Sequence, residues 1–106
     1  MKQEIAEVHE IDTTGAPAGG HTSGVGIQIT WQKGPLGRDG ARKEPNGAFV
    51  EGVIQAAVGR LEHFQSTRFK CRENALAITK LEEALHWLQS RADDREKRGI
   101  EGTNAV

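Results

Sequence analysis

The second half of the chain carries a hydrophobic pattern with helical spacing. Apolar residues recur three and four positions apart from Ala48 to Gln65, and again from Cys71 to Lys97. This spacing places apolar side chains on one face of a helix. The segment STRFKC between the two series breaks the pattern, which predicts two helices in an antiparallel hairpin. The expected stripes are Val50, Val53, Ile54, Ala57, Val58, Leu61 and Phe64 in the first helix, and Leu76, Ala77, Leu81, Ala84, Leu85, Leu88 and Ala92 in the second.

The residues at the helix ends agree with these boundaries. Asn46 precedes the first helix and is predicted to cap it, because its side-chain oxygen can accept a hydrogen bond from a free backbone N–H. The second helix ends with Arg95, Lys97 and Arg98, which complement the negative end of the helix dipole. Gly99 then suits the left-handed conformation that commonly follows a helix.

The segment VGIQITWQ, residues 25–32, alternates between apolar and polar positions and is predicted to be a half-buried strand. Its backbone groups need a partner, for which EIAEVHEI near the N-terminus is the local candidate and another subunit is the alternative. The Gly-, Pro-, Thr- and Ser-rich residues 12–24 and the turn-rich residues 34–47 are predicted to be loops. One face of the strand is expected to carry Val25, Ile27, Ile29 and Trp31, and the other Gly26, Gln28, Thr30 and Gln32.

These elements predict an α+β fold in a single domain. A short N-terminal β and loop segment occupies residues 1–44, and the helical hairpin with a C-terminal tail occupies residues 45–106. We expect the hairpin to provide both oligomerisation and ligand binding.

Composition adds the expectation of an oligomer. Only 36% of the 106 residues are hydrophobic and 5% are aromatic, with no tyrosine, which is little material for a monomeric core. The apolar arc of the second helix is also wide, because Ile78, Leu85 and Trp87 do not share one narrow seam. Small scaffolds often compensate by assembling, so a homo-oligomer built through the hairpin is predicted.

The charge balance argues against several classes of partner. The net charge is −1 and the isoelectric point is near 6.4, whereas DNA-binding modules usually carry a basic surplus. No apolar run approaches the roughly 18 residues of a membrane span, and the polar, acidic N-terminus does not resemble a secretory signal. We therefore expect a cytoplasmic protein that binds neither DNA nor membrane.

No residue set predicts catalysis, a metal or a cofactor. The four histidines are scattered, and the glycine-rich segments GVGIQ and GPLG match no phosphate-binding loop. The single Cys71 excludes an internal disulfide. It lies between basic residues near a helix start, where a thiol can be activated, but an incidental cysteine is the favoured interpretation. Trp87 is expected in the core rather than as a stacking platform.

The arginines carry the remaining chemical information. They fall at separate places along the chain: the loop, the hairpin tip and the end of the second helix. Separated guanidinium groups suit small anionic ligands such as phosphates better than a polymer. On periodicity alone, the favoured interpretation is that they balance the fifteen acidic residues. The groups are Arg38 and Arg42, Arg68 and Arg72, and Arg91, Arg95 and Arg98.

The segment CRENALAITKLEEALHWLQSRADDREKRGIEGT, preceded by PNGAFVEGVIQAAVGRLEHFQ, resembles the helical hairpin domain shared by phage anti-CBASS and Thoeris anti-defence proteins. The resemblance covers about residues 45–103, and R-E-N-x-L-A-x-T-K-L-E-E-A-x-x-W is its most specific part. HTSGVGIQITWQKGPLGR also resembles the N-terminal β segment of the Thoeris anti-defence branch. That branch is therefore the closer one.

The resemblance implies a non-enzymatic phage protein that acts in the cytoplasm of the infected bacterial host. Proteins of this family are sponges: they bind cyclic nucleotide immune signals without cleaving them, so that the host effector is not activated. They are symmetric homo-oligomers, often hexamers. Their ligands include cyclic ADP-ribose isomers, cyclic dinucleotides and cyclic trinucleotides. The lack of a tyrosine near the first helix favours an ADP-ribose-type ligand here over a dinucleotide.

Six residues are the candidate ligand contacts under this resemblance. Arg72 of CREN is the first candidate for a phosphate, because free N–H groups at a helix start also favour an anion. Asn46 and Phe49 of NGAF are candidates for base or ribose contacts, with a core role for Phe49 equally open. Arg91 and Arg95 are further phosphate candidates, and Thr79 is a candidate hydrogen-bond donor.

Two other functional classes remain open. A structural or adaptor protein would assemble through the same hairpin and bind no small molecule. An enzyme that degrades the same signals would need a catalytic residue set, and the sequence offers none.

Overall fold

A computed structural model describes residues 2–106. The chain divides into two compact units. The sheet unit comprises the chain up to Phe49 together with Ile100–Val106, and the hairpin unit comprises Val50–Gly99. The chain therefore leaves the sheet unit before the first helix and returns to it after the second.

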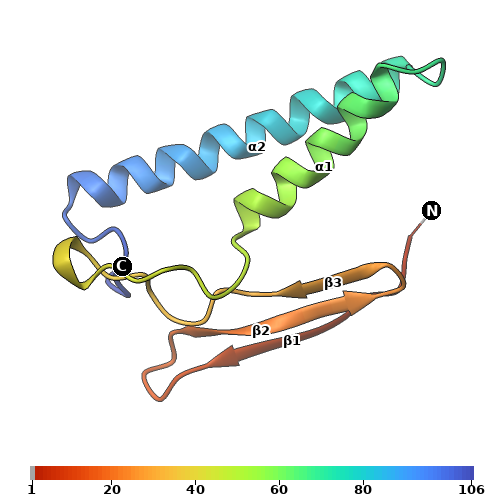
Figure 1. The fold of residues 1–106 in the computed structure, drawn as a ribbon. Helices are drawn as coiled ribbons and strands as arrows, with labels where there is room; N and C mark the ends of the chain where they lie inside the picture. The colour runs from red at the N-terminus through yellow and green to blue at the C-terminus, as the bar shows by residue number, and fades with distance from the viewer. Residues whose placement is uncertain (1) are drawn as a thin grey trace. The chain divides into compact units, whose positions relative to one another are not determined.

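The sheet unit contains three antiparallel strands in the order β1-β2-β3: β1 (Ala6–Ile11), β2 (Pro17–Gly24) and β3 (Ile27–Thr30) (Figure 1). The strand near the N-terminus is confirmed, but its neighbour is β2. The prediction of a loop over residues 12–24 is wrong from Pro17 onward. β2 lacks an alternating apolar pattern because it contains Gly19 and Gly20, both with positive φ. A Cβ at Gly20 would collide with the backbone oxygen of Val8, so the close strand approach requires glycine.

Both turns between the strands are short and specific. Val25 and Gly26 connect β2 to β3, and Gly26 has a φ of 76°, which glycine adopts without steric cost. Val25 is 90% exposed, so its assignment to the buried face is wrong. In the β1–β2 turn the Asp12 carboxylate accepts hydrogen bonds from Thr14 N (2.8 Å), Thr14 Oγ1 (2.6 Å) and Ala16 N (3.1 Å). The Thr14 hydroxyl and these backbone N–H groups lower the pKa of Asp12.

A polar contact lies at the centre of the sheet unit. Thr22 in β2 is only 5% exposed, and its hydroxyl oxygen accepts a hydrogen bond of 2.9 Å from the indole N–H of Trp31. The half-buried Trp31 follows β3 and forms an isolated parallel bridge with Ala48. The segment leading to the first helix is thereby joined to the sheet.

The C-terminal tail packs on the loop that contains the short 3-10 helix η1 (Asp39–Ala41). The Gly37 backbone N–H donates to the Gly102 carbonyl oxygen over 2.7 Å. The Arg42 guanidinium contacts both carboxylate oxygens of Glu101, at 2.8 and 2.9 Å, and Arg38 donates to the Glu101 carbonyl oxygen. Arg38 and Arg42 therefore balance an acidic residue, as periodicity alone predicts.

The hairpin unit consists of α1 (Val50–Gln65) and α2 (Arg72–Lys97). Both predicted helices are confirmed, and Gly99 has a φ of 72° after α2, as predicted. α1 begins at Val50, so the prediction that Asn46 caps it is wrong. Gln65 closes the connection, because its side-chain amide donates to the Cys71 carbonyl oxygen (3.0 Å) and accepts from the Cys71 N–H (2.9 Å).

The apolar seam between α1 and α2 follows most of the predicted stripes. The half-buried apolar residues of the two helices are Val53, Ile54, Val58, Leu61 and Phe64 on α1, and Ala77, Ile78, Leu81, Ala84, Leu85, Leu88 and Ala92 on α2. Val50, Ala57 and Leu76 are exposed instead. Trp87 is 66% exposed, so its predicted core position is wrong. No hydrophobic side chain within residues 2–106 is fully buried, and no helix in this part of the chain is long and apolar enough to cross a membrane.

Candidate functional site

Four of the six candidate ligand contacts lie along α2. Arg72 is its first residue, followed by Thr79, Arg91 and Arg95. At a rise of 1.5 Å per residue, Arg72 and Arg91 are about 28 Å apart along the axis, whereas Arg72 and Thr79 are about 10 Å apart. One hairpin therefore does not bring the arginines together around a small ligand. A site that uses both ends of α2 must combine copies of the chain.

Arg72 and Arg91 are both exposed. Neither forms an ion pair with another residue in the part of the chain that the structure describes. Exposed guanidinium groups without a carboxylate partner can bind phosphate bidentately. Thr79 is also exposed, whereas Arg95 is half-buried.

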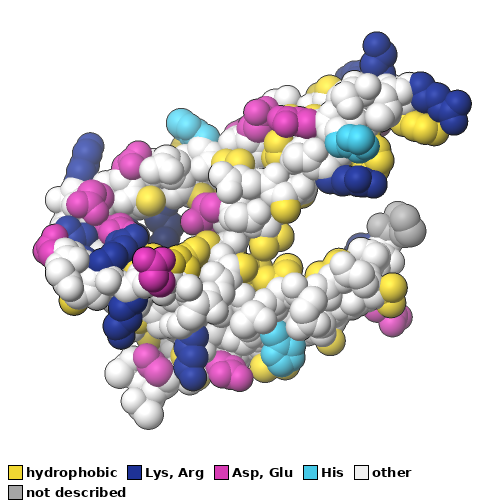
Figure 2. Space-filling model, viewed as in Figure 1, with side chains coloured by type: hydrophobic (Ala, Val, Ile, Leu, Met, Phe, Trp, Pro, Cys, Tyr) yellow, Lys and Arg dark blue, Asp and Glu magenta, His cyan; other side chains and the backbone are white. Residues whose placement is uncertain are grey.

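The hairpin tip collects further positive charge. Arg68, Lys70 and Arg72 are all exposed, and Figure 2 shows Lys and Arg side chains gathered at this end of the hairpin beside exposed hydrophobic ones. Phe69 is 65% exposed, with the Arg68 guanidinium 4.8 Å from its ring centroid. Such a surface can offer phosphate contacts and a stacking platform together.

Asn46 and Phe49 belong to the sheet unit. The Asn46 side-chain oxygen accepts from the Lys33 N–H (2.8 Å), and its NH₂ group donates to the Lys33 carbonyl oxygen (3.2 Å). Asn46 thus holds the chain after β3 in place. Its side-chain amide already forms two hydrogen bonds, so a ligand would have to bind it in addition to these. Phe49, just before α1, is 40% exposed, so part of this residue is accessible.

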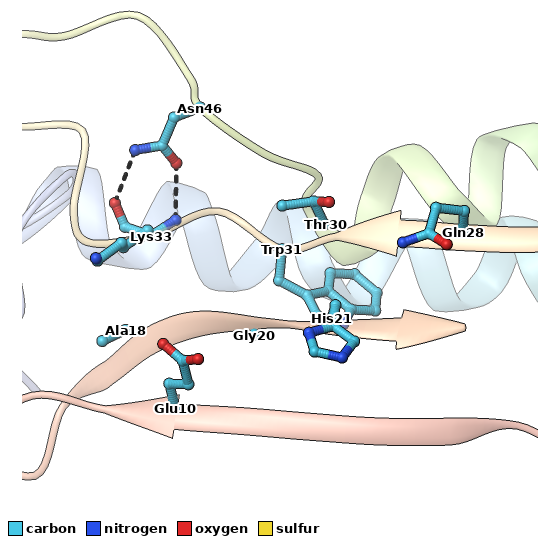
Figure 3. A pocket seen from close by; sticks show the side chains of 9 residues that line it. All are labelled: Glu10, Ala18, Gly20, His21, Gln28, Thr30, Trp31, Lys33 and Asn46. Atoms are coloured by element: carbon cyan, nitrogen blue, oxygen red, sulfur yellow. Dashed lines mark hydrogen bonds between the residues drawn. The ribbon is translucent and has the colours of Figure 1, made fainter.

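Asn46 also lines a hollow of the sheet unit, which has a volume of about 570 Å³ (Figure 3). Glu10 from β1, His21 from β2 and Lys33 after β3 contribute ionisable groups. None of these three side chains forms a hydrogen bond or ion pair within residues 2–106. The remaining lining residues are Ala18, Gly20, Gln28, Thr30 and Trp31.

The register explains why these side chains meet. His21 pairs with Val8 and with Thr30, and Ser23 pairs with Gln28, so the even-numbered residues of β1 and β3 share a face with His21. The alternating pattern correctly places Gln28 and Thr30 on one polar face. It misses Glu10, His21 and Lys33, because they become neighbours only once residues 17–24 form the central strand.

The hollow offers a carboxylate, an ammonium group, an imidazole and neutral amide and hydroxyl groups. This mixture can hydrogen-bond a polar small molecule that carries both hydroxyl and anionic groups. Within residues 2–106, no three His, Cys, Asp or Glu side chains are arranged to hold a metal ion. Cys71 is exposed at the N-cap of α2, without a side-chain capping bond.

The comparison with known families covers β3, α1 and most of α2. Residues 24–93 match the family described as Acb2/Tad1, hairpin domain. The match extends over more than half of the chain, so the chain belongs to this family. The resemblance in the hairpin sequence is thereby confirmed.

A curated relative places the chain near the Thoeris branch of the family. It is Thoeris anti-defense 1 of Bacillus phage SBSphiJ7, which is 50% identical over 76 residues. The aligned region covers 72% of this chain and 51% of the relative. The chain therefore spans about half the length of the relative that it matches.

Proposed function

We propose that this protein is a phage anti-defence sponge, which binds cyclic nucleotide immune signals and sequesters them without cleavage. The observation that carries the proposal is the 50% identity with Thoeris anti-defense 1 over 76 residues. Cyclic ADP-ribose isomers are the first ligand class, with cyclic dinucleotides and trinucleotides as further candidates. The protein acts in the cytoplasm of the infected bacterium, where lowering the free signal leaves the host effector inactive.

The charges of the hairpin support binding of a phosphate-containing ligand. Arg72 and Arg91 are exposed and form no ion pair with described residues. The positive end of the α2 dipole adds to the charge of Arg72. Because the two arginines lie about 28 Å apart along α2, we assign each ligand to a joint between copies, with Arg72 from one copy and Arg91 or Arg95 from another. Thr79, Phe49 and Asn46 are the proposed neutral contacts.

Exposed apolar side chains support assembly through the hairpin. Leu76 and Trp87 are 45% and 66% exposed. They are eleven positions apart, which corresponds to slightly more than three turns, so both lie on the same face of α2 about 16 Å apart. This face is distinct from the α1–α2 seam. A homo-oligomer, with a hexamer as the first expectation, would bury it.

Calorimetric titration of the full chain with a cyclic ADP-ribose isomer, a cyclic dinucleotide and a cyclic trinucleotide tests the proposal. The bound fraction is then heated and its ligand analysed by chromatography. We expect saturable binding of at least one class and recovery of unchanged ligand. Absence of binding to all three classes would refute the sponge, and recovery of a cleaved ligand would show an enzyme instead.

Single substitutions locate the site. We expect Arg72→Ala to weaken ligand binding at least tenfold, since a charge-assisted hydrogen bond contributes about 1.5–3 kcal/mol. Lys43→Ala is the matched control, because it removes one positive charge from an exposed residue that is not among the proposed contacts. Equal loss of affinity in both variants would indicate a general charge effect rather than a site.

An adaptor that assembles through the hairpin and binds no ligand is the second candidate, favoured by the exposed Trp87. It predicts that Arg72→Ala retains anti-defence activity in infected cells while Leu81→Asp abolishes it. The sponge predicts that both variants lose activity.

A further inference from the structure

The two edges of the sheet differ in how they are covered. At the β3 edge, Ala48 donates to the Thr30 carbonyl oxygen (2.7 Å) and accepts from the Gln32 N–H (3.0 Å). At the other edge, every residue of β1 is exposed, and no further strand pairs with it among the described residues. An uncovered edge of this length presents N–H and C=O groups that can pair with another strand.

The β1 edge is also regular. Between the pairs His9–Gly20 and Ile11–Pro17, β1 advances by two residues while β2 advances by three. The extra residue of this bulge therefore belongs to β2, and β1 keeps an even spacing of its outward backbone groups. Proteins commonly protect an edge with a bulge in the edge strand itself, but here the bulge spares that strand.

The sequence of this edge is complementary to itself. If two copies of β1 pair antiparallel about Val8, Glu7 of one copy lies opposite His9 of the other, twice by symmetry. Ile5 and Ile11, which are 48% and 70% exposed, lie opposite each other in the same way. Directly opposed residues of an antiparallel pair are close enough for charge and apolar contacts.

The charges select this register over its neighbour. The nearest symmetric register toward the N-terminus is pairing about Glu7, which would place Glu7 opposite itself and Glu4 opposite Glu10, and opposed like charges are destabilising. Glu7 and His9 already approach each other within one chain, with Glu7 Oε2 3.5 Å from His9 Nε2. Both side chains are more than half exposed, so they remain accessible to a second copy.

We propose that β1 is a two-fold joint between copies of this chain, in which two β1 strands pair antiparallel about Val8 and join two sheets into one. The occupant of the edge is a second copy, because pairing of the strand with itself sets Glu7 opposite His9 and Ile5 opposite Ile11. This joint is separate from the hairpin assembly and does not depend on nucleotide binding.

A charge-swap series on the full chain tests the joint. Its members are Glu7→Lys, His9→Glu, and the double variant, which restores opposite charges across the joint in exchanged positions. Glu62→Lys on the exposed face of α1 is the control for the change of charge. Sedimentation equilibrium without ligand gives the mass of the assembly, whichever larger assembly the hairpins form.

We expect His9→Glu to halve the mass of the assembly, because residue 9 of each copy would then place a carboxylate opposite Glu7 of the other. Glu7→Lys should lower the mass as well. The double variant and Glu62→Lys should keep the wild-type mass. Equal masses for the whole series, or a double variant no better than His9→Glu, would overturn the proposal. Failure of nucleotide binding would refute the sponge and leave this result unaffected.

Cysteine cross-linking then tests the register. In a Cys71→Ser background, Val8→Cys places the two thiols directly opposite each other, and oxidation should give a disulfide-linked dimer. Ala6→Cys on the same face would separate the thiols by four residues, about 13 Å, beyond disulfide reach. Equal cross-linking of both variants would overturn the pairing about Val8.

Discussion

The sheet unit and the hairpin unit are stabilised by different kinds of interaction. The sheet unit depends on directed polar contacts: Trp31 to Thr22, Asn46 to Lys33, and Arg42 to Glu101. The hairpin unit depends on an apolar seam between α1 and α2, with Gln65 closing the loop. A hydrogen bond or ion pair is lost when one of its atoms is replaced. The stability of an apolar seam depends instead on the volume and charge of the side chains in it.

This difference bears on what each unit can tolerate. A typical hydrogen bond contributes a net 0.5–1.5 kcal/mol or so, and losing one loosens a local part of the sheet. The seam runs along α1 and the part of α2 that faces it, so a charge inside it affects the neighbouring turns of both helices. Damage to the hairpin should therefore spread along the helices, and damage to the sheet should remain local.

Leu81→Asp gives the largest expected effect and tests the seam directly. Leu81 is half-buried near the middle of α2, and the substitution removes its apolar contacts and introduces a charge there. We expect a loss of about 3 kcal/mol of unfolding free energy, measured by thermal unfolding followed by circular dichroism at the helix band. Ser90→Asp, which adds the same charge at an exposed position of α2, should unfold as the wild type does. Equal destabilisation by both variants would show that the seam is not the main support of the hairpin.

The hairpin can be predicted from the sequence because the spacing of its apolar residues is a local pattern. Helical spacing identifies Val53, Ile54 and Leu61 without knowledge of distant partners, and Gly99 marks the end of α2. The prediction fails for Leu76 and Trp87, which are apolar like the residues of the seam but are exposed. In one copy of the chain they face solvent, and periodicity does not distinguish such a face from a core.

The sheet unit was harder to predict because its strands depend on distant partners. The alternation of apolar and polar residues predicts β3. β2 is glycine-rich and forms a strand only because it pairs with a strand on each side. The Asn46–Lys33 contact and the Glu101–Arg42 pair join residues 13 and 59 positions apart, with no local signal. The hollow containing Glu10, His21 and Lys33 depends on that register and was missed for the same reason. The hairpin candidates came from family resemblance, and their ligand contacts stay a prediction.

Thr22→Val tests whether damage to the sheet remains local. The substitution keeps the shape of the side chain but leaves the Trp31 indole N–H without its acceptor, at a cost of about 1–2 kcal/mol. We expect faster amide hydrogen exchange in residues 17–32 and unchanged exchange in residues 50–97, measured by mass spectrometry. Thr30→Val is the matched control, because it makes the same change at an exposed position of β3. Faster exchange throughout α1 and α2 would mean that the two units unfold together.

Asp12→Asn gives the smallest expected effect and separates charge from shape in the β1–β2 turn. Hydrogen bonds from Thr14 and Ala16 hold the pKa of Asp12 below the ordinary value of 3.8. A carboxylate with a lowered native pKa contributes stability above its unfolded pKa and loses it as the pH falls through the native value. We therefore expect the turn amides to exchange faster in the variant than in the wild type at neutral pH.

This difference in exchange rate should shrink below pH 3.8 and disappear once the wild-type carboxyl is protonated. NMR titration of the Thr14 and Ala16 amides measures this, with Asp93→Asn in α2 as the control that leaves the turn unchanged. If the difference persisted with Asp12 protonated, the shape of the side chain would stabilise the turn and its charge would not. The directed contacts of the sheet unit would then depend on hydrogen-bond geometry more than on charge.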